Sequence, residues 1–474
     1  MTELEQRKRR HRNERIVAAT VVLLALVAAV AVGLWDRKTQ NELARQTTYV
    51  PKKAHITPEI QLLQQYLKID TSNPPGNELP AALWLAAMIE HAGVHTEIIE
   101  SAPRRANLYA RIRGKHPGEG LLLLHHTDVV PPGENWTQPP FGAQVYLNQL
   151  YGRGALDMKA TGICELRAFL DIAESHKQPE RDIVFLAVAD EEAGSVYGMR
   201  WLIEHRPDVI EGVKYAINEG GITEMKAEEI TYYGVEIGTK QIATLMLRAP
   251  SREQLQRVRI MLEPWFVRRE ADRVSPEVKR WMHDLAPQRL AFRDQLNDVD
   301  AAIATGRFWD LPLGYREMTQ DNLFGDAIRR DRNEWQMKVF LLDLPDTDPD
   351  KRIEWLREKV TPFGVTVGTV LRKEGPVPVS SDQTPFFHLL RDEVHRTYGG
   401  IPVGTEMLNK WFNDSRFLRT RGIEAYGVNP FAVDFFQSDS IHGVNERVRL
   451  DYFAKGVGFL RNLVMAYAFQ TSLT

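Results

Sequence analysis

LLLLHHTDVV, residues 121–130, is a run of four leucines that leads into two histidines and an aspartate. Four consecutive leucines are apolar on both faces of a strand, which is typical of an inner strand in a sheet covered on both sides. Successive side chains of a strand alternate, so we expect His125 and His126 to point to opposite faces. A second apolar run, DIVFLAVADEE, follows at residues 182–192 and also ends in acidic residues.

The segments around these two runs alternate between strand-like and helix-like patterns. ATGICELRAFLDIAES, residues 160–175, lies between the runs and has helical spacing, as does GMRWLIEHR at 198–206. YAINEGG, residues 215–221, is typical of a short strand that ends in a loop. This alternation predicts an α/β domain with a mostly parallel central sheet flanked by helices.

The pattern changes over residues 239–371, where two strand-like stretches flank charged segments with short helical pieces. We expect a smaller α+β domain to be inserted here. The α/β style returns from about residue 372. The predicted α/β domain therefore consists of residues 56–238 and 372–474.

The N-terminus predicts a membrane anchor. Residues 1–15 contain six Lys or Arg and three Glu, and residues 16–35 contain no charge. Twenty helical residues reach about 30 Å, the thickness of a bilayer core. The basic flank places the N-terminus in the cytoplasm and the main body outside, with residues 36–55 as a polar linker. A cleaved signal peptide is the alternative, but its apolar core is usually only 7–15 residues long.

Composition narrows the class of protein further. The chain has 474 residues, 43% of them hydrophobic and 26% charged, as in globular proteins. A net charge of −3 gives no support to a nucleic-acid binder. The single cysteine, Cys164, excludes an intrachain disulfide and a cysteine-based zinc cluster, and we expect it to be a buried core residue. A metal site would have to use histidines and carboxylates.

Five segments place such side chains where strands or loops end, and ligands bind beyond the carboxyl ends of strands in open α/β sheets. The segments are LLLLHHTDVVP, GRGALDMK, FLAVADEEAGS, YAINEGG and DSIHGVNE. The residues that they offer are His126 and Asp128, Asp157, Glu191 and Glu192, Glu219, and His442. Each alone has an ordinary explanation as a turn or helix-start residue. Together, imidazoles and carboxylates suit Zn²⁺, Mn²⁺ or Co²⁺.

The order of these segments resembles the co-catalytic zinc hydrolases that include aminoacylase, carboxypeptidase G, carboxypeptidase S and succinyl-diaminopimelate desuccinylase. The matching stretches run from DTSNPPGNE, which begins at residue 70, to SIHGVNERV, which ends at residue 448. Between them lie HTDVVP, GRGALDMK, DEEAGS, NEGG and NDSRFLRTRGI. NPPGNE and SPEVKRWM make the carboxypeptidase S branch the most similar.

The resemblance implies two Zn²⁺ ions, with Co²⁺ or Mn²⁺ possible, and a small peptide or N-acyl amino acid as substrate. It also implies that a metal-activated water attacks the amide bond, and that the chain could form a homodimer. The implied roles are His126 and Glu219 on one metal, His442 and Glu192 on the other, Asp157 between the metals, Glu191 as general base, Asp128 orienting His126, and Arg416 and Asn413 in the substrate site.

The resemblance makes residues 56–238 and 372–474 the catalytic domain and residues 239–371 an inserted domain of the lid or dimerisation type, but this second domain departs from the family pattern. The family has a Gly-His-Ser-Ser turn after its first strand there, whereas IATLMLRAP runs directly into SREQL. An Asn-x-x-Pro stretch is also not recognisable, and Asn333 is its only candidate. Two hypotheses are open. The chain is a working hydrolase with another oxyanion donor, Asn333 or Asn413, or it is an exported peptide-binding or scaffold protein that binds metal and is catalytically weak or inactive. The intact base and ligands favour the hydrolase.

Overall fold

The computed structural model describes residues 55–472, apart from 222, 227–228, 266–272, 374, 376, 409–411 and 434. The described elements belong to one compact unit that begins at His55. None of the helices in these ranges is long and apolar enough to cross a bilayer. The predicted anchor at residues 16–35 lies outside the described residues, and the anchor stays a prediction.

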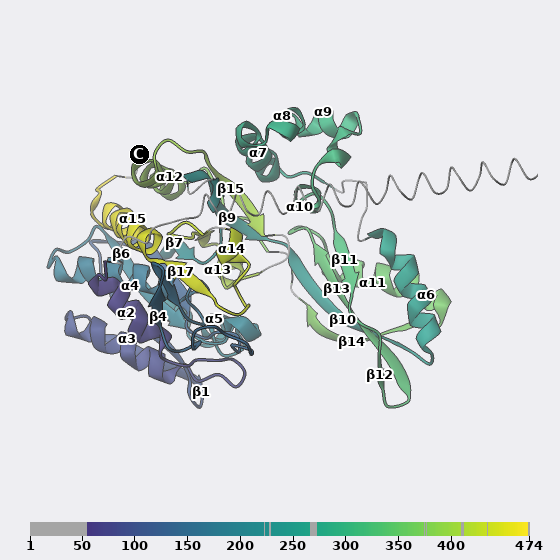
Figure 1. Ribbon diagram of the computed structural model, residues 1–474, viewed down its shortest axis with the longest axis horizontal. Helices are drawn as coiled ribbons and strands as arrows, with labels where there is room; N and C mark the ends of the chain where they lie inside the picture. The colour runs from purple at the N-terminus through teal and green to yellow at the C-terminus, as the bar shows by residue number, and fades with distance from the viewer. Residues whose placement is uncertain are drawn as a thin grey trace, which may run out of the picture. The chain divides into compact units, whose positions relative to one another are not determined.

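A nine-stranded sheet forms the larger part of this unit, in the order β1-β2-β6-β3-β7-β16-β9-β15, with β8 beside β9. Its central strands β6, β3, β7 and β16 run parallel, and antiparallel pairs flank them (Figure 1). This confirms the predicted α/β fold with a parallel central sheet. The strands are β1 (Thr96–Ala102), β2 (Arg105–Ile112), β3 (His116–His126), β6 (Arg181–Val188), β7 (Val213–Asn218), β8 (Thr223–Lys226), β9 (Glu229–Thr239), β15 (Val403–Leu408) and β16 (Glu424–Gly427).

Helices cover both faces of this sheet, which explains why β6 is buried along its whole length. Leu122 and Leu124 of β3 pack in one apolar cluster with α5 and α13. His125 points to the other face, where it contacts α2 and α4, so the predicted alternation is confirmed. Cys164 is buried in α4, as expected. The helices are α2 (Pro58–Leu67), α3 (Leu79–His91), α4 (Lys159–Glu174), α5 (Met199–His205), α12 (Pro385–Tyr398), α13 (Ser415–Arg419) and α15 (Leu450–Phe469).

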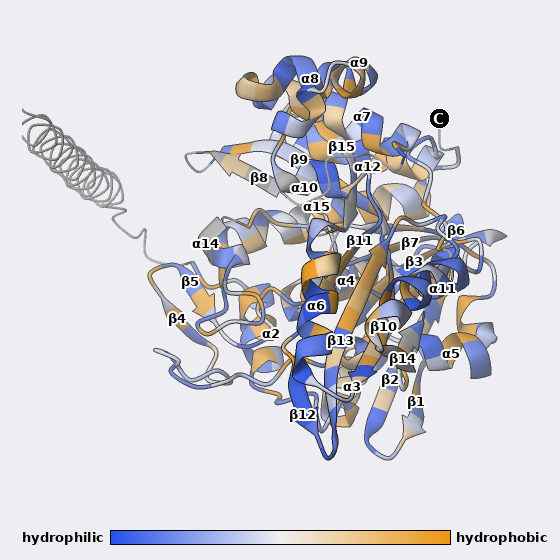
Figure 2. Cartoon of the chain, turned by 90° about the vertical axis from the view of Figure 1, so that its right-hand side faces the viewer, coloured by the Kyte–Doolittle hydropathy of each residue, from blue (hydrophilic) through white to orange (hydrophobic). Residues whose placement is uncertain are grey.

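A separate antiparallel sheet has the order β11-β13-β10-β14, with β12 beside β13. Helices α6 and α11 lie on the same side of it (Figure 1) and share an apolar core with its strands. The hairpin of β12 and β13 is hydrophilic at its tip (Figure 2). The elements are β10 (Gln241–Ala249), α6 (Arg252–Leu262), β11 (Asn322–Gly325), β12 (Arg329–Asp331), β13 (Glu334–Asp343), α11 (Pro349–Val360) and β14 (Thr366–Lys373).

The described residues between α6 and β11 form four short α-helices. The first of them, α7, packs against β15 of the nine-stranded sheet, and Arg280 forms an ion pair with Asp382 at 2.6 Å. Part of the 239–371 segment therefore contacts the larger sheet. The four helices are α7 (Pro276–Leu285), α8 (Arg293–Asn297), α9 (Val299–Ala304) and α10 (Leu313–Glu317).

A small antiparallel sheet joins two distant parts of the chain. It consists of β4 (Gln144–Tyr146), β5 (Gln149–Tyr151) and β17 (Arg447–Arg449), in the order β17-β5-β4. The loop after β5 leads to α4, and the loop before β17 follows α14 (Phe435–Ser438). Pairing of β17 with β5 therefore brings these two loops together.

Candidate metal centre

Three neighbouring strands of the nine-stranded sheet end at one place. His126 is the last residue of β3, and β3 lies between β6 and β7. Glu191 and Glu192 begin the short 3-10 turn after β6, and Glu219 directly follows β7. Because the three strands are parallel, their carboxyl ends lie side by side, where α/β folds bind ligands.

The two remaining predicted ligands come from the loops that β5 and β17 bring together. Asp157 lies in the loop before α4, and His442 lies in the loop before β17. Asp157 Oδ1 is 3.0 Å from His126 Nε2, and Asp157 Oδ2 is 2.9 Å from His442 Nε2. Each carboxylate oxygen of Asp157 therefore faces a different histidine.

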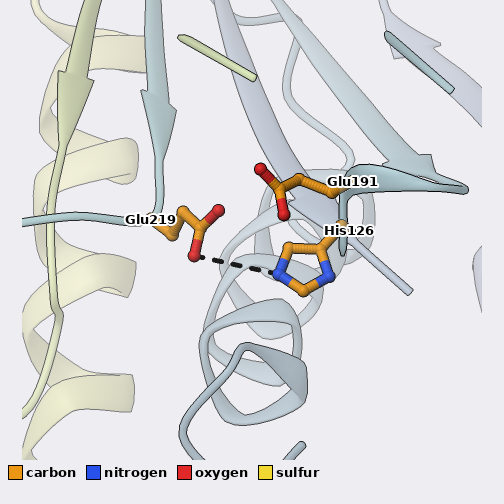
Figure 3. Close-up of side chains that lie close together, drawn as sticks. All are labelled: His126, Glu191 and Glu219. Carbon is orange, nitrogen blue, oxygen red and sulfur yellow. Dashed lines mark ion pairs between the residues drawn. The ribbon is translucent and has the colours of Figure 1, made fainter. Parts of the chain in front are cut away.

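Three glutamates complete the cluster. Glu219 Oε2 is 3.8 Å from His126 Nε2, and Glu192 Oε2 is 3.2 Å from His442 Nε2. The side chains of Glu191 and Glu219 approach the His126 imidazole from different sides (Figure 3). Glu191, Glu219 and His126 form one group whose ligand atoms lie within 4.8 Å of one another, and Glu192, Asp157 and His126 form another. Glu192 is thus within reach of both histidines.

The residues fit a divalent cation. Glu191 Oε1 and Glu192 Oε1 are buried and have no hydrogen-bond partner among the described residues. A buried carboxylate oxygen without a partner is costly unless it is paired or coordinates a metal. Imidazole and carboxylate donors accept Zn²⁺, Co²⁺ or Mn²⁺.

The pKa values of the clustered side chains also favour a bound divalent cation. Burial raises the pKa of Glu192 and of Glu219 to about 7, and the charge of Asp157 adds to both shifts. Burial, followed by the charge of Glu219, holds the pKa of Glu191 well above its ordinary value. Hydrogen bonds to Asp157 and Glu192 raise the pKa of His442 to about 10. The carboxylates disfavour one another's charge, and a divalent cation would relieve this repulsion.

Asp128 has a different geometry from the one that its expected role suggests. His126 Nδ1 lies 2.9 Å from the backbone carbonyl of Asp128 and 3.5 Å from its carboxylate. The carboxylate instead accepts hydrogen bonds from the backbone amides of Glu191 (3.1 Å) and Glu192 (3.3 Å). Asp128 therefore orients His126 through its main chain and holds the acidic turn through its side chain.

Of the predicted substrate residues, Arg416 lies in α13 and Asn413 lies just before this helix. Asn413 Nδ2 donates a hydrogen bond to the backbone carbonyl of Glu219 at 3.0 Å, so this amide helps to place a predicted ligand. The Arg416 guanidinium is buried and lies 4.5 Å from the ring centres of Phe412 and Phe417. Asn333 lies in the exposed turn between β12 and β13.

A buried polar network behind the acidic turn was not predicted from the sequence. Asn73 Nδ2 donates to Asp128 Oδ2 at 2.8 Å and to Asp190 Oδ1 at 2.9 Å. Arg105 contacts Asp190 at 2.7 Å and Glu78 at 2.8 Å. Asn73 and Glu78 both belong to the NPPGNE stretch, which contributed to the family resemblance but had no role assigned to it.

Replacing Arg105 with methionine is expected to lower the free energy of unfolding by about 3–5 kcal/mol, because it leaves two buried carboxylates without their cation. Urea denaturation measures this change. The control is Arg113→Met, whose side chain is 70% exposed in its ion pair with Asp182, and which should cost less than about 1 kcal/mol. Equal costs for both variants would contradict the structural role of Arg105.

Comparison with known proteins gives both sequence and fold relatives. Over 131 residues the chain is 40% identical to succinyl-diaminopimelate desuccinylase from Bradyrhizobium sp. (strain ORS 278). This match covers 26% of this chain and 34% of that protein, about a third of its length.

Two solved structures share the fold over most of their length. An M20 family metallo-carboxypeptidase from Sulfolobus solfataricus is 18% identical with a TM-score of 0.65, covering 87% of this chain and 99% of that one. Human carnosine dipeptidase 1 is 13% identical with a TM-score of 0.64, covering 86% and 95%. At these identities the likeness concerns the fold alone.

The sequence model of one family matches residues 122–466, which include the strand ends and the two loops that form the cluster. This range is most of the chain and contains every predicted metal ligand. The chain therefore belongs to peptidase family M20/M25/M40.

Proposed function

We propose that this chain hydrolyses amide bonds in small peptides or N-acyl amino acids with the help of two divalent metal ions, zinc being our first choice. The observation that carries the proposal is Asp157, whose two oxygens face His126 at 3.0 Å and His442 at 2.9 Å. A single carboxylate between two histidines, each with its own glutamate nearby, is the donor set for a pair of ions. The named relatives are a desuccinylase, a metallo-carboxypeptidase and a dipeptidase, which supports amide hydrolysis as the reaction class.

We assign His126 and Glu219 to one ion, His442 and Glu192 to the other, and Asp157 to both. When bound, such ions would lower the pKa of a water toward neutrality and would stabilise the negative charge that develops on the attacked carbonyl oxygen.

Glu191 would carry the proton. Its side chain lies in one group with His126 and Glu219, and its Oε1 has no hydrogen-bond partner within the described part of the chain. The bond from its amide to Asp128 fixes the turn on which it sits. Glu191 would take a proton from the nucleophilic water and later give it to the leaving amine.

Arg416 would bind the free carboxylate of the substrate. Its planar guanidinium can pair two carboxylate oxygens at once. The rings of Phe412 and Phe417, each 4.5 Å away, would fix the plane of that guanidinium. Asn413 would act beside it by holding the main chain at Glu219, at 3.0 Å.

A substrate screen tests the proposal. The full-length chain is incubated with zinc and a panel of N-acyl amino acids and dipeptides, and product formation is measured before and after treatment with a chelator. We expect cleavage of at least one member, loss of activity on chelation, and recovery when zinc is restored.

A second candidate is a metal-binding protein that does not catalyse hydrolysis. It is favoured by the connection between β10 and α6, where only Pro250 and Ser251 separate strand from helix and leave no room for the family's histidine turn. Two bound metal ions without cleavage of any panel member would support this candidate against the hydrolase.

We further propose that residues 16–35 anchor the chain in a membrane, with the N-terminus in the cytoplasm and the catalytic domain on the other side. The support is the uncharged segment and its basic flank. The full-length chain should sediment with membranes and resist extraction by high salt, and a variant that begins at residue 36 should be released. Release of both by salt would contradict the anchor. The homodimer likewise stays a prediction.

A further inference from the structure

A buried ion pair joins the two loops of the metal centre. Arg153 lies in the loop after β5, and Glu446 directly precedes β17, 293 residues further along the chain. Arg153 Nη1 is 2.5 Å from Glu446 Oε2, and the two side chains are 1% and 0% exposed. Replacement of a buried ion pair by apolar residues is often neutral or stabilising, so this pair calls for a reason other than stability.

The Glu446 carboxylate fixes the main chain that leads to Asp157. Its Oε2 accepts a hydrogen bond from the amide of Gly154 at 2.9 Å. Its Oε1 accepts from the amides of Leu156 at 2.7 Å and of Asp157 itself at 3.1 Å. The carboxylate on one loop therefore sets the position of the residue that faces both histidines.

The Arg153 guanidinium in turn holds the other loop, which carries His442. Its Nη2 donates hydrogen bonds to the backbone carbonyls of His442 at 3.2 Å and of Gly443 at 2.8 Å. His442 has φ of 60°, a left-handed conformation that is uncommon for residues other than glycine. Such a conformation persists where its surroundings hold it, and the guanidinium supplies two contacts that do so.

We infer that Arg153 and Glu446 are positioning residues, which set the distance between Asp157 and His442 and so shape the half of the metal centre that belongs to His442. This inference rests on the two-ion centre proposed above. His126 and Glu219 are placed by the ends of β3 and β7 and do not depend on this pair. Asp157 is shared by both ions, so loss of the pair should weaken both. The ion on the His442 side should be weakened far more, because its histidine also loses the support of Arg153.

Zinc titration of the metal-free full-length chain by calorimetry tests this selectivity. In Glu446→Gln, the carboxamide keeps one oxygen but turns an NH₂ group toward donors that need an acceptor. We expect the affinity for one zinc to fall about 10–100-fold, as for other residues that orient metal ligands, and the affinity for the other, which shares only Asp157 with it, to fall by a clearly smaller factor.

A double variant identifies the affected ion. In a chain with His442→Ala, the ion on the His442 side is already lost. Adding Glu446→Gln to that chain should lower the affinity of the remaining ion only by the smaller of the two factors, because the larger loss belongs to the ion that is already absent.

A matched control and a second variant keep the test decisive. Asp343→Asn breaks another buried ion pair, which Asp343 of β13 forms with Arg352 of α11 at 3.1 Å. It should leave both zinc affinities unchanged. Arg153→Lys keeps the charge but has no fork to reach Glu446 and the His442 carbonyl together, so it should reproduce the selective loss even if Glu446→Gln fails to fold.

The outcomes distinguish a failure of the proposed function from a failure of this inference. Wild-type chain that binds no zinc would overturn the proposed function and this inference with it. Wild-type chain that binds two zincs, with both affinities in Arg153→Lys within threefold of its values, would overturn this inference alone. Equal weakening of both ions would also overturn it, because that would indicate a general effect on the fold.

Discussion

Glu191→Gln is expected to lower kcat by about 10²–10⁴-fold while both metal ions stay bound. Glutamine has the size of glutamate, and its backbone amide still donates to Asp128, so the turn after β6 should keep its shape. It cannot accept a proton from the nucleophilic water. The measurement is steady-state kinetics on the best substrate from the panel, together with metal analysis of the same sample.

The control for this prediction is Glu204→Gln, on α5, whose side chain is 54% exposed in an i,i+4 pair with Arg200. It removes the same charge far from the proposed chemistry and should leave kcat within about twofold, as for most surface changes. A Glu191→Gln enzyme with activity within a few-fold of wild type would remove Glu191 from its role as general base.

Asp157→Asn is expected to abolish turnover by a different route, through loss of metal. Each oxygen of Asp157 faces a different histidine, so an amide removes both the negative charge and one of the two acceptors. We expect the affinity for zinc to fall more than about 100-fold at one ion or both, which exceeds the usual effect of residues that only support a ligand. Metal analysis after dialysis against a chelator measures it.

Metal content thus distinguishes the two variants, since Glu191→Gln should keep its ions and Asp157→Asn should lose them. Asp208→Asn is the matched control, because this aspartate is 55% exposed and pairs with Arg206 at the surface. Full zinc occupancy in Asp157→Asn would contradict the place of Asp157 between the ions.

The part of the site that lies on the central sheet could be predicted from sequence, because one rule governs it. Apolar runs such as 121–124 and 183–188 are typical of inner strands, and the residues at or just after the carboxyl end of an inner parallel strand lie at the ligand-binding edge. His126 is the last residue of such a strand, Glu219 directly follows another, and Glu191 begins the short turn after a third. The rule depends on local pattern alone, so it needs no knowledge of tertiary contacts.

The supporting residues could not be predicted in this way, because their partners are distant in sequence. Glu446 is a charged residue in a polar loop until its bonds with Arg153 and the amide of Asp157 are known. The spacing of His126 and Asp128 also cannot tell whether the carbonyl or the carboxylate approaches the imidazole. These are properties of side-chain geometry, which the pattern does not encode.

The sequence pattern did not predict β9 and β15 of the larger sheet, again because a partner that is distant in sequence decides their burial. β9 and β15 carry the buried glutamates Glu236 and Glu406 in register with each other. A charged residue inside a strand obscures the apolar pattern, and the ion pair of Glu236 with Arg419 at 2.9 Å, which makes its burial possible, is formed with a helix far along the chain.

Anomalous X-ray diffraction at the zinc edge, from crystals of the zinc-loaded full-length chain, would show whether the chain binds a pair of ions and where they lie. We expect two peaks on either side of the Asp157 carboxylate. One should lie in contact with His126 and Glu219, and the other in contact with His442 and Glu192. A single peak, or peaks away from these side chains, would contradict the two-ion centre.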